Sequence, residues 1–264
     1  MDGLIDLFKD IKMDVTKPYI VQGIGSYLNH EFEINPYDFL NYAKNDLMGN
    51  SLRGSLNALS NSKRSIDCQI DAIYQAIGIT NDIETDNIKS FIGRYESINS
   101  PINAPTKLKL IQALGMAPTG VIKKVRTLRN KLEHYYKAPT REEVEESIEL
   151  TELFIGSLQN RMHTFVEEVT IGKNKNLEND NGQFYQCVYI NYDTNKKIFT
   201  ASSFIKGEKS KILEININDK PYLYLIKLFL LLETEPDIKN IWKDLIYSIG
   251  YDSIPISNIY KTYF

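Results

Sequence analysis

The sequence predicts a mainly α protein, in which an antiparallel helical bundle over residues 35–170 is followed by a small α+β domain over residues 183–264. Two observations predict this class. Apolar residues recur at three- and four-residue spacing through the first part of the chain, and they alternate with polar residues after it. The polar residues 171–182 between the two parts, rich in Asn and Lys, indicate a linker. Residues 1–34 are interpreted as an N-terminal arm, weakly ordered or opening with one short helix.

Capping and breaking residues place the helices of the bundle. Asn35 and Pro36 supply a cap and a first turn, and Thr140 with Glu143 forms a capping box that opens the last helix. The predicted helix before it, over residues 121–137, is ended by Pro139. The first predicted helix starts at Asn35 and continues through Leu47. The others cover about Ser51–Ile77, Asp82–Ser97, Thr106–Leu114, Val121–Lys137 and Arg141–Glu168.

The C-terminal domain reads as strands followed by helices. Its predicted strands are Phe184–Tyr192, Ile198–Ile205 and Lys211–Ile217, and its predicted helices are Tyr222–Leu232 and Asp237–Ile249. Four aromatic residues in the strands are open to two interpretations, a surface on which bases stack or ordinary cross-strand packing. They are Tyr185, Tyr189, Tyr192 and Phe199.

Composition favours an ordinary cytoplasmic protein. The chain has 264 residues, of which 42% are hydrophobic and 25% charged, and this is enough to bury a sizeable core. Cys68 and Cys187 lie far apart in different kinds of element, so no disulfide or metal knuckle is expected. The N-terminus lacks the pattern of a signal peptide, and the longest apolar run is too short to span a bilayer. Gly23-Ile24-Gly25 lacks the rest of a dinucleotide fingerprint, so we expect no cofactor and no metal.

The predicted helix over residues 121–137 has two distinct faces. At 100° per residue, an apolar stripe faces a core, and a polar stripe with His134 lies opposite. Arg129 and Glu133 sit at the edge of the polar stripe, where an ion pair between them would fit the spacing equally well. The apolar stripe is Val121, Val125, Leu128, Leu132 and Tyr135, and the polar stripe is Lys123, Arg126, Asn130, His134 and Lys137.

Charge is distributed unevenly around this helix. The net charge of −3 argues against a protein coated in nucleic acid, yet residues 123–137 hold six Lys and Arg residues and only one acidic residue. An acidic block follows at Glu142, Glu143, Glu145, Glu146, Glu149 and Glu152. This pattern predicts local binding of an anion by the basic helix, while a solvated helix face is the alternative reading of either run.

The segment Arg129-Asn130-x-x-x-His134 resembles the Arg-x-x-x-x-His signature of HEPN-domain proteins, including the polar residue after the arginine. The resemblance extends to residues 107–118 and 57–68 and covers roughly residues 35–170. It implies a metal-independent ribonuclease that dimerises so that two motif helices form one composite site. It also allows a member that only binds RNA or nucleotides, or that serves as an assembly scaffold.

The resemblance implies roles for the residues of the motif helix. Arg129 would hold the scissile phosphate, His134 would transfer protons, and Asn130 would orient the phosphate or His134. The cations expected to bind RNA or its phosphates are Lys123, Arg126, Lys131 and Lys137.

Tyr136 extends the motif to a pattern similar to HEPN toxins whose antitoxin is a minimal nucleotidyltransferase. In those pairs the tyrosine is modified, so Tyr136 is a candidate modification site, with packing of its ring against the apolar stripe as the alternative. The expected partners are RNA, a second copy of the chain, and an antitoxin or nucleotidyltransferase. A toxin or an antiviral defence effector would fit this description.

Overall fold

The computed structural model describes residues 3–23, 25–79, 85–96, 105–174, 177, 184–210, 212–234, 238–251 and 255–263. Over these residues the protein is mainly α, with nine α-helices and a mixed β-sheet. The chain divides into two compact units. We call residues 29–75 and 92–162 the helical unit, and residues 1–28, 76–91 and 163–264 the sheet unit. None of the helices in the described ranges is long and apolar enough to cross a membrane.

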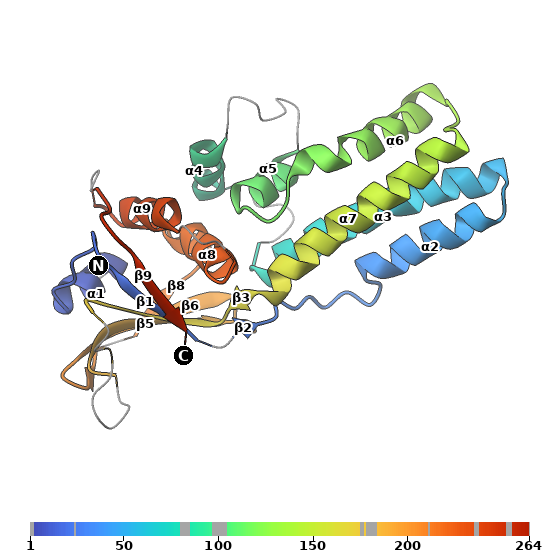
Figure 1. Cartoon of the computed structure of the whole chain (residues 1–264). Helices are drawn as coiled ribbons and strands as arrows, with labels where there is room; N and C mark the ends of the chain where they lie inside the picture. The colour runs from blue at the N-terminus through green and yellow to red at the C-terminus, as the bar shows by residue number, and fades with distance from the viewer. Residues whose placement is uncertain are drawn as a thin grey trace. The chain divides into compact units, whose positions relative to one another are not determined.

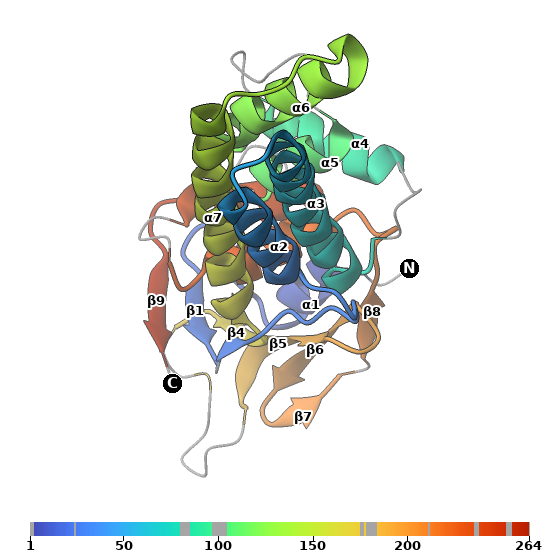
Figure 2. The ribbon, with the colours of Figure 1, turned by 90° about the vertical axis from the view of Figure 1, so that its right-hand side faces the viewer.

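The helical unit is built from long helices that pack side by side, as the two views of α2, α3 and α7 show (Figures 1 and 2). The predicted cap is confirmed, because the Asn35 side chain accepts hydrogen bonds from the backbone of Tyr37 and Asp38. The capping box before α7 is confirmed as well, with reciprocal bonds between Thr140 and Glu143. The helices are α2 (Pro36–Met48), α3 (Leu52–Ala76), α5 (Thr106–Ala113), α6 (Lys123–Tyr135) and α7 (Arg141–His163), with a 3-10 turn at Thr119–Ile122.

Polar contacts between these helices supplement an aliphatic core. The Ser65 hydroxyl donates to the Pro36 carbonyl at 2.7 Å, which joins α3 to α2. The Gln159 amide donates to Gln69 at 3.0 Å, which joins α7 to α3. Ser65 and Gln69 are both buried, so these hydrogen bonds restrict the rotation of the helices against one another more than surface pairs would.

The sheet unit contains a seven-stranded sheet in the order β7-β6-β5-β4-β1-β9, with β8 also paired to β6. All neighbours are antiparallel except β1 and β9, which pair in parallel. The strands are β1 (Tyr19–Gln22), β4 (Glu168–Gly172), β5 (Gln186–Asp193), β6 (Ile198–Ile205), β7 (Glu208–Lys209), β8 (Leu213–Ile215) and β9 (Tyr260–Tyr263), and a separate short pair is formed by β2 (Gly25–Ser26) and β3 (Phe165–Val166).

Three helices pack on the sheet unit's core: α1 (Leu4–Asp10), α8 (Tyr222–Leu231) and α9 (Lys239–Ser248). Figure 1 shows α8 and α9 on the same side of the sheet. Every residue of α8 is buried, which is typical of a helix that is apolar all round. Phe229 of α8 lies 4.9 Å from Phe199 of β6, measured between ring centroids. The α4 helix (Asp86–Tyr95) begins in the sheet unit and ends in the helical unit.

The aromatic strand residues do not form one stacking surface. Tyr192 and Phe199 are fully buried in the core. Tyr189 lies on the opposite face of β5 from Tyr192, because side chains alternate along a strand. The Tyr189 hydroxyl donates to the Glu168 carboxylate, and burial with this contact raises the pKa of Tyr189. Core packing is therefore the correct reading for Tyr192 and Phe199.

Three sequence expectations differ from the structure at the unit boundaries. The short helix expected near the N-terminus is confirmed as α1, but this part of the chain is not an arm, because Leu4, Leu7 and Phe8 of α1 are buried and β1 pairs with β4 and β9. The last bundle helix stops at His163 instead of reaching Glu168, because the chain enters β3 and β4. Residues 171 and 172 of the expected linker belong to β4, while residues 175, 176 and 178–182 lie outside the described residues.

Residues 76–91 also belong to the sheet unit, although the sequence placed them in the bundle. The Tyr192 hydroxyl donates to the carbonyl of Ala76 at 3.0 Å. The Tyr222 hydroxyl lies 3.0 Å from the carbonyl of Ile77 and 2.9 Å from that of Lys197. Carbonyls at a helix end lack partners within the helix, so these buried tyrosines satisfy the end of α3. Burial raises the pKa of both hydroxyls.

We expect Tyr222→Phe to lower the free energy of unfolding by about 1–3 kcal/mol, because the carbonyls of Ile77 and Lys197 lose the one hydroxyl donor that they share. Urea unfolding followed by the fluorescence of Trp242 measures this directly, since it is the one tryptophan of the chain and is buried in the sheet unit. Tyr37→Phe, at a 40% exposed tyrosine, is the matched control and should leave the unfolding midpoint in place. An unchanged midpoint in Tyr222→Phe would contradict this account of the helix end.

Candidate functional site: a basic pocket on the motif helix

The α6 helix is held by a narrow apolar stripe. Val125 and Leu128 are its buried residues, while Val121 before the helix and Leu132 within it are half-buried. Tyr135 was predicted to continue this stripe, but it is 78% exposed because the last turn of the helix extends past the buried part. The Lys124–Glu146 ion pair joins α6 to α7. Stripe and ion pair together set the rotation of α6, which decides where its polar residues face.

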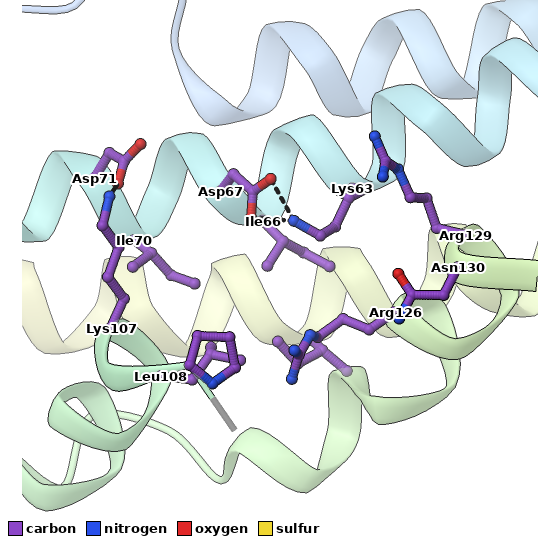
Figure 3. A pocket seen from close by; sticks show the side chains of 12 residues that line it. Lys63, Ile66, Asp67, Ile70, Asp71, Lys107, Leu108, Arg126, Arg129 and Asn130 are labelled. Carbon is purple, nitrogen blue, oxygen red and sulfur yellow. Dashed lines mark hydrogen bonds and ion pairs between the residues drawn. The ribbon is translucent and has the colours of Figure 1, made fainter. Parts of the chain in front are cut away.

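A pocket of about 450 Å³, which we call the basic pocket, lies between α3, α5 and α6 within the helical unit. Arg126, Arg129 and Asn130 of α6 line one side, and Figure 3 shows Arg126 extending from α6 toward Leu108 of α5. Both aliphatic and charged side chains line the pocket. Besides those named, the lining residues are Lys63, Ile66, Asp67, Ile70 and Asp71 of α3, Pro105 and Lys107 at the start of α5, and Ile122.

Most charges of the pocket are paired. Lys63 pairs with Asp67 along α3, and Lys107 of α5 pairs with Asp71 of α3 (Figure 3). Arg129 pairs with Glu133, so the ion pair that the sequence left open does form. The two side chains are 35% and 36% exposed, and an exposed i, i+4 pair contributes only about 0.3–0.5 kcal/mol. An incoming phosphate can therefore replace Glu133 at little cost.

Arg126 is the cation of the pocket that has no carboxylate partner among the described residues. Four cationic and two anionic side chains line the cavity, so its potential is positive. The guanidinium of an arginine presents donors in a planar fork that matches phosphate oxygens. Because aliphatic side chains line it as well, the pocket suits a ligand that joins an anionic group to a less polar body.

The other predicted residues of α6 do not line this pocket. His134 lies in the last turn of the helix, exposed, one turn beyond Asn130. Lys123 and Lys131 are exposed as well, and neither makes an ion pair within the described part of the chain. A single chain thus brings Arg126, Arg129 and Asn130 together in a cavity and leaves His134 outside it.

Tyr136 ends the helix. Its φ of 52° lies in the left-handed region, so α6 stops before Lys137 and well before Pro139. The amide of Lys137 still donates to the Lys131 carbonyl at 3.4 Å. The ring of Tyr136 is 88% exposed, which excludes the reading in which it packs against the apolar stripe.

The acidic block of α7 is a partly paired helix surface. Glu146 pairs with Lys124, Glu145 with Arg141, and Glu152 with Lys44 of α2. The pairs of Glu146 and Glu152 connect α7 to α6 and α2, whereas the Glu145–Arg141 pair lies within α7. The block also neutralises Lys124, one of the six cations of the basic segment.

Sequence reasoning missed the contribution of α3 and α5 to the pocket. Lys63 and Asp67 are four residues apart, a spacing that signals an ion pair on one helix face, but their proximity to α6 depends on the fold.

Burial and the carboxylates of Asp71, Asp38 and Asp67 raise the pKa of the Cys68 thiol to about 11. Cys68 is therefore protonated near neutral pH and is not a nucleophile there.

The remaining histidines have structural surroundings. His163 stacks on Tyr27, with 4.3 Å between ring centroids. His30 is half-buried, and this burial lowers its pKa. The described residues contain no group of three or more His, Cys, Asp or Glu side chains arranged to hold a metal ion.

We expect inorganic phosphate to bind in the pocket and to stabilise the folded chain, by about 1.4 kcal/mol at about ten times its dissociation constant. Arg126→Ala should remove most of this gain, because it deletes the unpaired guanidinium. Differential scanning calorimetry in phosphate and in chloride of equal ionic strength measures the difference. Lys209→Ala, at an exposed lysine of β7, serves as the control for a lost surface charge. An equal phosphate effect in wild type and Arg126→Ala would remove Arg126 from the site.

Comparison of the chain with protein-family models, with curated proteins and with solved structures finds no match. No relative therefore supplies a function. Any assignment depends on the pocket, on the exposed side chains of α6 and on the resemblance of the Arg129–His134 segment to the HEPN signature.

Proposed function

We propose that the protein is a metal-independent endoribonuclease of HEPN type. The observation that carries the proposal is the pocket that joins Arg126, Arg129 and Asn130, with His134 one turn further along the same helix. In the proposed reaction the 2′-hydroxyl of RNA attacks the adjacent phosphorus. The bond to the 5′-oxygen of the next nucleotide breaks, leaving a 2′,3′-cyclic phosphate and a 5′-hydroxyl end.

The residues divide this work between them. His134 removes the proton of the 2′-hydroxyl or returns one to the leaving oxygen. Arg129 exchanges Glu133 for the scissile phosphate and stabilises the charge of the transition state. Arg126 and Lys123 extend the track of cations along the RNA backbone, and Lys131 and Lys137 lie on the exposed side of the same segment.

A second copy of the chain completes the proposed site. Cleavage needs one group that accepts a proton and one that donates a proton, whereas α6 offers a single histidine. Its exposed position supports pairing of two α6 helices about a two-fold axis, so that the histidines share the two roles. Opposed cations repel, so apolar or Glu133-type contacts must flank them, and bound RNA should tighten the pair.

A binding module without cleavage is the second candidate, and one observation favours it. The Arg129–Glu133 ion pair occupies the arginine, and His134 lies outside the pocket in the single chain. Such a module would hold RNA or a nucleotide through Arg126 and Asn130 and leave it intact. Incubating the pure protein with total RNA in EDTA separates the two candidates, because only the enzyme shortens the RNA.

In that assay we expect His134→Ala to lower the cleavage rate by roughly 10²- to 10⁴-fold, the usual contribution of proton transfer. Arg129→Lys should fail similarly, because a point charge does not reproduce two-point contact with phosphate. His163→Ala is the matched control, since His163 is exposed but lies in the sheet unit. Full activity in His134→Ala, or strict dependence on an added divalent metal, would contradict the mechanism.

Assembly is tested separately. We expect a two-fold symmetric dimer that places the two α6 helices near its axis and buries at least about 1,000 Å². Light scattering at micromolar concentration, with and without RNA, reports the mass. A monomer under both conditions would rule out the composite site while leaving the binding module in place.

We propose further that Tyr136 is the residue through which a nucleotidyltransferase partner silences the enzyme. Its exposed ring at the end of α6 leaves the hydroxyl accessible, and an attached nucleotide adds phosphate charge and bulk beside the basic segment. A toxin or antiviral defence effector held silent in this way fits the proposal.

We expect coexpression with such an enzyme to add mass at Tyr136 and to block cleavage without separating the dimer. Tyr136→Phe should keep ribonuclease activity and escape silencing, whereas Tyr135→Phe, at the adjacent exposed tyrosine, should still be silenced. Intact-mass and peptide mass spectrometry locate the modification. An unmodified chain, or modification of another residue, removes Tyr136 from this role.

A further inference from the structure

The helical unit has a second hollow, which we call the amide groove. It has a volume of about 490 Å³ and lies between α2 and α3. Unlike the basic pocket, it is lined by no aliphatic residue. The lining residues are Tyr42, Asn45 and Asp46 of α2, and Asn57, Ser60, Asn61 and Arg64 of α3.

The groove contains donors and acceptors that are free for a ligand. Asn61 is engaged, because its amide donates to Asp46 at 2.8 Å and its oxygen accepts from Arg64 at 3.2 Å. Asn45 and Asn57 are exposed, and their side chains make no hydrogen bond to the described residues. Each carboxamide offers one acceptor and two donors, so the groove presents one amide that is already engaged and two that are free.

These side chains match the chemistry of a nucleic-acid base. Carboxamides pair with the donor and acceptor pattern on base edges, and an exposed aromatic ring stacks on any base. Tyr42 is 48% exposed at the groove. Arg64 and Asp46 are of opposite charge, so the groove is close to neutral and favours the base of a nucleotide over its phosphate.

The groove and the basic pocket occupy adjacent faces of one helix. Asn57, Asn61 and Arg64 follow the four- and three-residue spacing of one face of α3. Lys63, next to Arg64 in the chain, lines the basic pocket. A helix with its side chains is about 10–12 Å wide, so a short stretch of single strand reaches from one face to the next.

We propose that the amide groove reads bases of single-stranded RNA whose backbone lies on the basic pocket. This inference rests on the proposed function, and it adds sequence preference to it. The basic pocket and stacking on Tyr42 supply affinity that is independent of sequence, and Asn45 and Asn57 supply the discrimination.

Fluorescence anisotropy with labelled single-stranded homopolymers of A, C and U tests the proposal in the His134→Ala background, with EDTA present. We expect the parent to prefer one homopolymer by about fivefold or more, the order expected for base contacts. Asn45→Ala with Asn57→Ala should reduce this preference below about twofold. Arg126→Ala should weaken all homopolymers by one common factor and keep the preference.

Two substitutions of Tyr42 distinguish lost stacking from misfolding, because Tyr42→Phe keeps the ring and Tyr42→Ala removes it. Tyr42→Ala should weaken every homopolymer by about tenfold through lost stacking, while Tyr42→Phe should bind as the parent does. RNA binding with equal affinity for all homopolymers, or a preference that survives in the Asn45/Asn57 variant, overturns the amide groove and leaves the proposed function intact. A parent that binds no RNA overturns both.

Discussion

The rotation of α6 about its own axis is the constraint on which the candidate site depends. Only Val125 and Leu128 are buried on this helix, and the Lys124–Glu146 ion pair adds a second point of attachment to α7. With these points fixed, helical periodicity directs Arg126, Arg129 and Asn130 toward α3 and α5. A rotation by one residue would bring Lys131 to the direction that Asn130 now has and would turn Arg129 to the direction of the buried Leu128. A stripe of two buried residues therefore decides which polar groups converge.

The cations of the basic pocket differ in whether they have a carboxylate partner that an anionic ligand must replace. Three of the four pocket cations already have carboxylate partners, in Asp67, Asp71 and, for Arg129, Glu133. Pairs that are about one-third exposed contribute little to stability, so an anion can replace a carboxylate at little cost to the fold. In the proposed function, a phosphate first meets Arg126, the unpaired cation, and then competes with Glu133 for Arg129. Arg129 would thus exchange a carboxylate partner for a phosphate partner.

Local signals in the sequence predicted the helices well. Asn35 before α2 and Thr140 before α7 are signals contained within a few residues. The starts of α2, α3 and α7 and the ends of α2 and α3 were placed within one residue, whereas α7 ends at His163 and not at Glu168. The sheet unit was harder, because β1 acquires its partners from the far end of the chain. Tyr19 pairs with Gly172 on one side and with Tyr260 on the other, and neither pairing leaves a local mark. A four-residue strand with distant partners cannot be recognised from its own residues.

The candidate site divides in the same way. Arg129, Asn130 and Arg126 were predicted from one helix, because spacing on a single helix is sufficient to place them together. Lys63 and Lys107 come from α3 and α5, and only the packing of three helices brings them to the cavity. His134 was correctly assigned to the face away from the core, and in the proposed dimer a second chain brings it to the phosphate. Tyr136 ends the helix in a left-handed conformation that the sequence before Pro139 did not indicate.

The proposed reaction is cleavage of RNA at α6 by attack of the neighbouring 2′-hydroxyl, without a metal ion. The chemistry of the ends tests it most directly. A defined single-stranded RNA is incubated with the full chain in EDTA, and the fragments are analysed by mass spectrometry. The account predicts fragments ending in 2′,3′-cyclic phosphate, each followed by a fragment that starts with a 5′-hydroxyl. Fragments with 3′-hydroxyl and 5′-phosphate ends, or RNA that remains intact, would contradict it.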